Sequence, residues 1–271
     1  MAKVLGEPGR YVTEQAIQKF RKGIMLLFVS GCICAFLCGM AACLTFSMRR
    51  GSSLIPATVS ALLILVVFWI WRIVDRMDAR YEKERLSMRK GAIGEAAVAL
   101  ILDSFPNDYW VIHDLTTPSG NLDHVVVGPT GVFVIDTKNW TGVVSADGHG
   151  ELLLNGKPRE KAAVKTLVGR TMAIRDKVLS LCANDQTRQS EAPFFHSVLA
   201  FPSAQVTANW GSTGVADCVR GEKLWDYIVE DRKGRTLSTQ QVDCYAKAFR
   251  ALAQMDADFE VQVSDSPPRV D

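Results

Sequence analysis

Two long apolar stretches precede the patterned part of the chain. The first, Gly23–Ser47, has 25 residues without a charged side chain, and the second, Gly51–Trp71, has 21. At a rise of about 1.5 Å per residue, each is long enough to cross a hydrocarbon layer of about 30 Å as a helix. We therefore predict a hairpin of two transmembrane helices joined by a short turn.

The pattern becomes charged and then amphipathic after the second apolar stretch. Arg72–Lys90 contains no proline or glycine and is rich in Arg, Glu and Lys, which predicts that the second helix continues as a stalk. Met88–Asp103 has the residue types of a further helical segment that enters a folded domain.

Short runs of β-branched and aromatic residues follow, separated by turn residues and by helical patterns. The predicted strands are Tyr109–Leu115, Leu122–Val127, Gly131–Lys138, Val143–Ser145, Glu151–Leu154, Ser197–Phe201 and Val215–Val219. The predicted helices are Arg159–Leu181, Gly221–Glu230 and Ser238–Met255. This order is typical of an α/β domain with a mixed sheet.

Charge divides the chain at the same place as hydropathy. Residues 1–90 hold 14 Lys and Arg against 6 Asp and Glu, whereas residues 91–271 hold 17 against 23. We expect a cytoplasmic N-terminal segment at 1–22, membrane helices within 23–71, a stalk at 72–90, the α/β domain at 91–258 and a frayed tail at 259–271.

The placement of Lys and Arg also predicts orientation. Five of these residues precede the first apolar stretch and seven follow the second, while the turn between them has two. The positive-inside rule then places both termini in the cytoplasm, and we expect a protein of a bacterial inner membrane. The seven cysteines form no CxxC pair, which agrees with a reducing compartment.

Candidate chemistry lies on two adjacent predicted strands. Asp123 is in one, and Asp136 and Lys138 share a face of the next because side chains alternate along a strand. Two carboxylates on one partly buried face repel each other, and a divalent cation such as Mg²⁺ removes that cost. His124 points to the opposite face, where we interpret it as a core histidine. A purely structural role for the two aspartates stays open.

Two further groups of residues add to this pattern. Glu95, on the preceding helix, is a third carboxylate that could face the same cluster. The segment Lys157–Lys177 holds seven basic residues against two acidic ones, and it is either a nucleic-acid-binding surface or the solvated face of a helix. The residues that we expect to contact a phosphate backbone are Lys157, Lys161, Lys165 and Arg170.

Three runs of sequence carry a resemblance to a known family. They are Gly91-Ala-Ile-Gly-Glu95, the segment from Gly120-Asn-Leu-Asp123-His through Val-Ile-Asp136-Thr-Lys138-Asn, and Gly142. Over roughly residues 88–205 the chain resembles the nuclease-related domain, NERD, which is similar to the PD-(D/E)xK nuclease superfamily with its restriction-endonuclease-like αβββαβ core. The resemblance implies that Asp123 and Asp136 bind metal, that Lys138 is catalytic and that Glu95 supports the site.

The function that this resemblance implies is Mg²⁺- or Mn²⁺-dependent hydrolysis of phosphodiester bonds, with DNA favoured over RNA as the substrate. The apolar stretches add the expectation that the protein is held in a lipid bilayer. An alternative is a membrane-tethered nucleic-acid-binding or interaction module with a degenerate site. Family members usually carry Glu at position 136, and an Asn-Pro and a Gln at the start of the next helix. This chain has Asp136 and Lys157-Pro158-Arg159-Glu160 there instead.

Overall fold

The computed structural model describes residues 1–48, 55–117, 120–182, 193–208, 216–230 and 237–261. The chain divides into two compact units, one formed by residues 1–11 together with 90–271 and the other by residues 12–89. The division near residue 90 agrees with the change in charge and hydropathy along the sequence. The inclusion of the first eleven residues in the larger unit does not follow from any sequence pattern.

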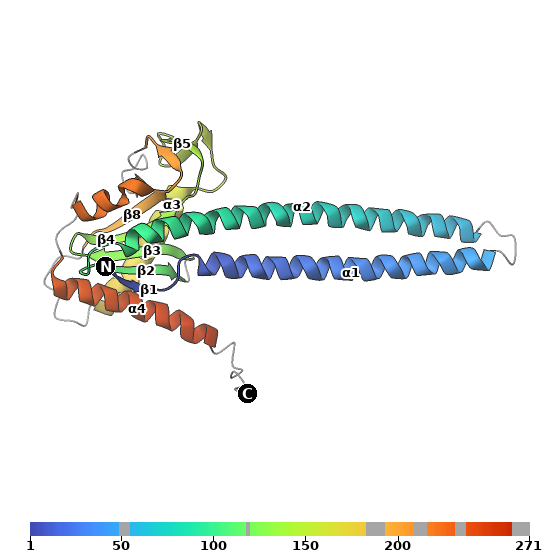
Figure 1. Cartoon of the computed structure of the whole chain (residues 1–271), viewed down its shortest axis with the longest axis horizontal. Coiled ribbons are helices and arrows are strands. Elements are labelled where there is room, and N and C mark those ends of the chain that lie inside the picture. The colour runs from blue at the N-terminus through green and yellow to red at the C-terminus, as the bar shows by residue number, and fades with distance from the viewer. Residues whose placement is uncertain (49–54, 118–119, 183–192, 209–215, 231–236, 262–271) are drawn as a thin grey trace. The chain divides into compact units, whose positions relative to one another are not determined.

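Unit 12–89 is made of two helices (Figure 1). Helix α1 spans Arg10–Met48, and helix α2 spans Ile55–Asp103 and so extends into the larger unit. The predicted continuation of the second apolar helix through the stalk matches α2. Within this unit the Lys19 Nζ atom lies 2.7 Å from a carboxylate oxygen of Glu84, which joins α1 to α2 by an exposed ion pair.

One stretch among the described residues, Glu14–Met40, is long and apolar enough to cross a membrane. Its place near the N-terminus is also where a signal sequence would stand, so length and composition support membrane association only weakly. The second expected span, Gly51–Trp71, begins outside the described residues, and its described part opens α2.

The larger unit contains a mixed sheet of six strands in the order β1-β2-β3-β4-β8-β10. The strands are β1 (Lys3–Leu5), β2 (Trp110–Leu115), β3 (Leu122–Gly128), β4 (Gly131–Thr137), β8 (Phe195–Phe201) and β10 (Ala216–Arg220). Strands β2, β3 and β4 are antiparallel, while β1 with β2, β4 with β8 and β8 with β10 pair in parallel. The mixed α/β class that the sequence predicts is therefore confirmed.

A second, smaller sheet has the order β7-β6-β5-β9. Its strands are β7 (Lys157–Pro158), β6 (Leu152–Leu154), β5 (Gly142–Ala146) and β9 (Ala204–Val206). The predicted strands Val143–Ser145 and Glu151–Leu154 match β5 and β6. Strands β7 and β9 are too short to show a periodic pattern in the sequence.

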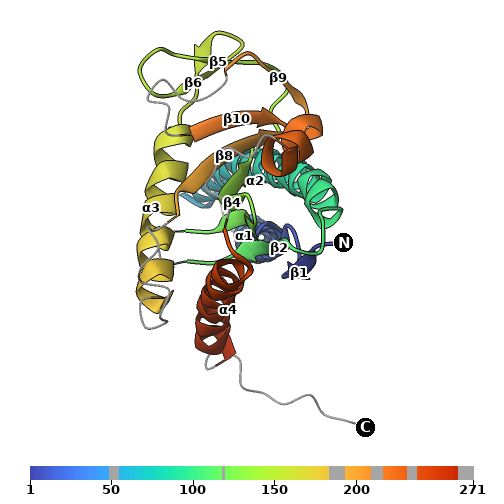
Figure 2. The same cartoon turned by 90° about the vertical axis from the view of Figure 1, so that its left-hand side faces the viewer.

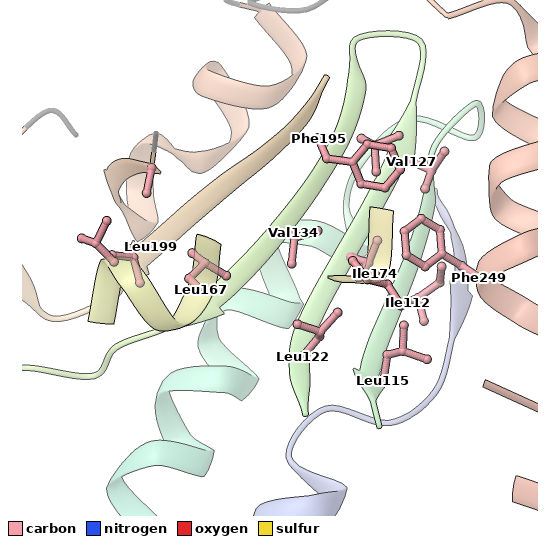
Figure 3. Close-up of a cluster of buried hydrophobic side chains, with 14 of the residues drawn as sticks. Ile112, Leu115, Leu122, Val127, Val134, Leu167, Ile174, Phe195, Leu199 and Phe249 are labelled. Carbon is pink, nitrogen blue, oxygen red and sulfur yellow. The ribbon is translucent and has the colours of Figure 1, made fainter. Parts of the chain in front are cut away.

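Alternating side chains of the large sheet enter two separate cores. On one face, residues such as Val134 and Leu199 pack against α3 (Ala163–Cys182) and α4 (Thr239–Val261), as Figure 3 shows for Leu167, Ile174 and Phe249. On the other face, Phe133 and Ile135 pack with the last turns of α2 and with η3 (Asp226–Glu230). Figure 2 shows the last turns of α2 and helix α3 on opposite sides of the sheet, so the domain has three layers.

Helix α3 begins four residues later than the pattern predicts. Lys157 and Pro158 are drawn into β7, where they pair with Leu154 and Leu153. The helix N-terminus is capped from a distance, because the Glu151 carboxylate accepts the backbone N–H groups of Val164 and Lys165 at 3.1 and 2.8 Å. Short 3₁₀ helix η2 (Gly221–Lys223) precedes η3, close to the predicted helix Gly221–Glu230. The expected frayed tail lies mostly outside the described residues.

Glycine at position 94 is required by the way α2 packs on the end of β4. A Cβ atom there would lie 2.5 Å from the Cβ of Asn139. The Asn139 side chain cannot move easily, because its Nδ2 donates to the Lys90 carbonyl and its Oδ1 accepts from Ser203 Oγ, both at 2.7 Å.

We expect Gly94→Ala to lower the free energy of unfolding by about 1–3 kcal/mol, as overpacking usually does. Gly91→Ala is the matched control on the same helix, because nothing lies within 4 Å of a Cβ at that position. It should stabilise the helix by about 0.5–1 kcal/mol. Urea unfolding of the full chain in detergent micelles measures both, and equal effects of the two changes would contradict the packing argument.

Candidate functional site

The two aspartates predicted from the sequence face each other across neighbouring strands. In the β3–β4 register His124 pairs with Ile135, so Asp123 stands opposite Asp136. The Thr137 backbone N–H donates a hydrogen bond to Asp123 Oδ2 at 2.7 Å. Asp136 is 7% exposed. Both side chains belong to the sheet face that α3 covers.

Two cations lie beside this pair. The Lys138 ammonium forms an ion pair with Asp136 Oδ2. Arg170, from α3, has a guanidinium nitrogen 3.8 Å from Asp136 Oδ1, and it donates to the Asn121 carbonyl at 3.0 Å. Burial lowers the pKa of Lys138, but the carboxylates of Asp136 and Asp123 outweigh it and raise that pKa above its ordinary value. Lys138 is therefore a firmly charged ammonium in the metal-free protein.

Glu95 is a buried member of the same cluster. It lies on α2 and is 7% exposed. Burial, together with the negative charges of Asp114 and Asp136, raises its pKa to about 7, against a smaller opposing effect of Lys138. The carboxylate predicted on the helix is thus brought next to the two strand aspartates.

Asp114 is a fourth carboxylate, which is not among the site residues predicted from the sequence. It is the second-to-last residue of β2 and lies in the left-handed region with a φ of 56°, and it accepts a hydrogen bond from Asn121 Nδ2 at 2.5 Å. A signal for it existed, because Asp114 is a charged residue within an apolar predicted strand. The same criterion selected Asp123.

The electrostatics of the cluster favour a bound cation. Burial, then the charges of Asp136 and Glu95, raise the pKa of Asp123 well above its ordinary value, although Lys138 and the Thr137 N–H act in the opposite direction. With every group ionised, the four carboxylates and the two cations Lys138 and Arg170 carry a formal charge of −2. A divalent cation would cancel this charge and return the carboxylates to their ionised form.

The donor set is small. In the part of the chain that the structure describes, no three Asp, Glu, His or Cys side chains are grouped to hold a metal ion. An ion at Asp123 and Asp136 would therefore take two protein carboxylates and complete its shell with water or with substrate oxygens. This coordination is typical of Mg²⁺, which keeps several waters and binds through one or two carboxylates.

His124 lies on the opposite face, as the alternation predicts. Its Nδ1 is 2.7 Å from Nδ1 of His113, whose Nε2 is 2.9 Å from a carboxylate oxygen of Asp103 on α2. Burial, followed by the proximity of His113, lowers the pKa of His124 well below its ordinary value. The interpretation of His124 as a core histidine is confirmed.

The predicted nucleic-acid-binding residues fall into two groups. Lys157, Lys161 and Lys165 are exposed on β7, on the segment after it and on the first turn of α3. Arg170 is instead half-buried beside Asp136. Arg159 extends the exposed group, with its guanidinium 5.4 Å from the centre of the Trp140 ring.

Comparison with known proteins identifies the segment that carries this site. Residues 90–202 match the family model of the nuclease-related domain, NERD. The match covers less than half of the chain, yet it includes all four carboxylates, Lys138 and Arg170. The family resemblance seen in the sequence motifs is thereby confirmed, and a nuclease-like function is suggested for this part of the chain.

One curated relative is uncharacterized. It is a protein of Bacillus anthracis that is 33% identical over 87 residues, which cover 30% of this chain and 41% of that protein. The chain thus spans about two fifths of the length of this relative. No solved structure matches the chain.

The raised pKa of Glu95 predicts a pH-dependent stability in the absence of metal. Its folded-state pKa of about 7 exceeds the ordinary 4.5. The protonated form therefore stabilises the fold below pH 4.5, and this contribution is lost as the pH rises through 7. At pH 8 in EDTA, we expect Glu95→Gln to be more stable than the wild type by about 2–3 kcal/mol, and the gain should vanish below pH 4.5.

Urea unfolding of both proteins at pH 4 and pH 8 measures this difference. Asp103→Asn is a suitable control, because Asp103 is a carboxylate of the same helix that is 42% exposed and contacts His113 rather than the Asp123–Asp136 pair. If Glu95→Gln raised the free energy of unfolding by the same amount at both pH values, the Glu95 carboxylate would not be destabilised by its surroundings.

Proposed function

We propose that this chain is a membrane-anchored nuclease that hydrolyses phosphodiester bonds of DNA in the cytoplasm with the help of Mg²⁺ or Mn²⁺. The observation that carries the proposal is the opposed pair Asp123 and Asp136, with Lys138 beside it, inside the segment that matches NERD. Nucleases similar to the PD-(D/E)xK superfamily commonly use divalent metals, and the paired carboxylates fit that use.

Each residue of the cluster has a proposed role. Asp123 and Asp136 would hold the ion, which supplies positive charge at the scissile phosphate and lowers the pKa of a bound water. Lys138, held as an ammonium, donates hydrogen bonds to phosphate oxygens and stabilises the charge that develops on them. Its high pKa in the metal-free protein favours this electrostatic role over proton abstraction.

Arg170 and Glu95 complete the arrangement. Arg170 reaches the carboxylate pair from α3. If a cation were bound by Asp136, the Arg170 guanidinium would be placed to donate to a phosphate oxygen instead. Glu95 faces the pair from α2 and would orient water next to the ion. The order α2-β2-β3-β4-α3-β8 supports a restriction-endonuclease-like core, with β5, β6 and β7 inserted between β4 and α3.

The exposed basic residues supply a surface for the nucleic-acid backbone. Lys157, Lys161 and Lys165 lie close together in sequence, from β7 to the first turn of α3, within a domain that is acidic overall. A local positive patch on an acidic domain can bind phosphates through release of counterions. DNA is proposed over RNA because of the family resemblance alone.

The sheet itself supports an anchor that crosses the membrane twice. Strand β1 precedes α1 and β2 follows α2, yet the two strands pair directly. If α1 spans a bilayer, the chain must return across it before β2, so the number of crossings is even. The apolar start of α2 is the segment available for the return, and the basic flanks place the domain in the cytoplasm.

A second candidate function is a binding module without catalysis. The specific observation in its favour is that Lys138 and Arg170 already lie against Asp136, so part of the negative charge is neutralised without a metal. The same site would then bind nucleic acid through its cations and the basic residues of β7 and α3.

Variants of a proposed metal ligand and of the proposed catalytic lysine distinguish the nuclease from the binding module. Asp136→Asn should abolish both cleavage and the rise in melting temperature on adding Mg²⁺, because it removes a proposed ligand. Lys138→Ala should change the Mg²⁺ concentration that gives half of the rise in melting temperature by no more than about twofold. The same change should lower the cleavage rate by at least ~100-fold. The assay uses the full chain in detergent with duplex, single-stranded and branched DNA and with RNA.

Lys223→Ala is the matched control, since Lys223 is exposed and pairs only with Asp226 among the contacts described. A Mg²⁺ response without cleavage of any substrate would support the binding module. The absence of both would show that Asp123 and Asp136 are structural.

Topology is tested separately from chemistry. A reporter fused after residue 271 and one fused before residue 3 should both be cytoplasmic, whereas one inserted at Ser52 should be on the outer side of the membrane. A fusion after residue 271 that reports the outer side would overturn the proposed orientation and the access of the site to DNA.

A further inference from the structure

The first nine residues form an ordered segment next to the candidate site. Strand β1 adds to the edge of the large sheet through β2, and the Lys3 backbone N–H donates to the Tyr109 carbonyl at 2.9 Å. The Lys3 Nζ atom lies 4.8 Å from the centre of the Trp110 ring. We call residues 3–9 the N-terminal strap.

The strap approaches the sheet so closely that it needs glycine. Gly6 has a φ of +81°, and a Cβ atom there would lie 2.3 Å from the carbonyl oxygen of His113. Any side chain at Gly6 would therefore push the strap away from β2. His113 directly precedes Asp114, so the strap passes the end of β2 where the carboxylate cluster begins.

The strap then meets Glu95. Gly9 is buried, and a Cβ atom built on it would lie 3.5 Å from Glu95 Oε2 and 3.7 Å from the Ala92 Cβ. The backbone at Gly9 thus occupies space next to the Glu95 carboxylate. Glu95 is 7% exposed. Helix α1 begins at the next residue.

We propose that the N-terminal strap is a positioning element of the metal site. Its backbone at Gly6 and Gly9 holds the Glu95 carboxylate in place against Asp114 and Asp136, and thereby sets the Mg²⁺ affinity of the Asp123–Asp136 pair. This inference rests on the proposed function, since Mg²⁺ binding is its readout. The segment that leads into the first apolar helix is then also part of the site.

The proposed metal site then depends on residues that precede the two apolar helices as well as on residues that follow them. A truncated protein that begins at residue 76 or 90, made to remove the apolar helices, would also lack the strap. Outer groups that orient ligands typically change metal affinity by 10–100-fold when they are removed, so such a cut should weaken Mg²⁺ binding even where the sheet still folds.

The test uses the full chain in detergent micelles and two matched pairs of variants. Gly6→Ala creates the collision with His113, whereas Gly148→Ala imposes the same left-handed backbone, with a φ of +78°, at a position with nothing within 4 Å. Lys3→Pro removes the N–H that binds Tyr109, whereas Lys3→Ala removes only the side chain. Mg²⁺ affinity is measured by calorimetry.

We expect Gly6→Ala and Lys3→Pro to bind Mg²⁺ about tenfold more weakly, with Gly148→Ala and Lys3→Ala unchanged. Hydrogen exchange of the β2 amides verifies that the strap is released in the first two variants. A Glu95→Gln background adds the decisive readout. If the strap acts by positioning Glu95, Gly6→Ala has no further effect on Mg²⁺ affinity in that background.

Two results would overturn this inference alone. One is a wild-type Mg²⁺ affinity in Gly6→Ala while exchange shows a released strap. The other is an equal loss of affinity in both backgrounds, which means that the strap only supports the fold. A wild type that binds no Mg²⁺ at all would overturn the proposed function and this inference together, whereas the first two results leave the proposed function standing.

Discussion

Two like charges on one buried face of a sheet are the constraint on which this domain depends. Asp123 and Asp136 stand opposite each other across β3 and β4, on the sheet face whose other side chains, such as Val125 and Val134, belong to the apolar core. An uncompensated pair of carboxylates in such a place is costly. Lys138 and Arg170 offset the repulsion with positive charge. Burial raises the pKa of Glu95 to about 7, so this carboxyl group carries less negative charge at neutral pH than an ordinary glutamate.

The register of one hairpin holds the pair together. Gly128 pairs with Gly131 across the tight turn between β3 and β4, which fixes His124 opposite Ile135 and hence Asp123 opposite Asp136. A slip of one residue in either strand would turn its aspartate to the face that carries His113 and His124. Gly128 is also held by its surroundings, because a Cβ there would lie 2.1 Å from the Tyr109 ring. The geometry of this turn therefore determines whether the two aspartates face each other.

The features that sequence reasoning found are those with a periodic or local signal. The central strands have strong β-branched runs, and charged residues inside those runs marked Asp123, Asp136 and Lys138. Features that depend on contacts distant in sequence were missed. Strand β1 has three residues and pairs with a strand more than a hundred positions away, so no local pattern predicts it. Arg170 looked like part of a basic helix face, and only the packing of α3 on the sheet brings it to Asp136. The start of α3 was misplaced because Glu151 caps it from a preceding loop.

The most direct test of the central claim is a double-mutant cycle of Asp123→Asn and Asp136→Asn on the free energy of unfolding, carried out once in EDTA and once in saturating Mg²⁺. If the two carboxylates share a cation site, the coupling between them is unfavourable in EDTA, because each removal relieves repulsion. It changes sign in Mg²⁺, because both are then needed to hold the ion. A coupling that is the same in both conditions would contradict the account, since it would show that the pair is a structural feature of the sheet with no metal between its members.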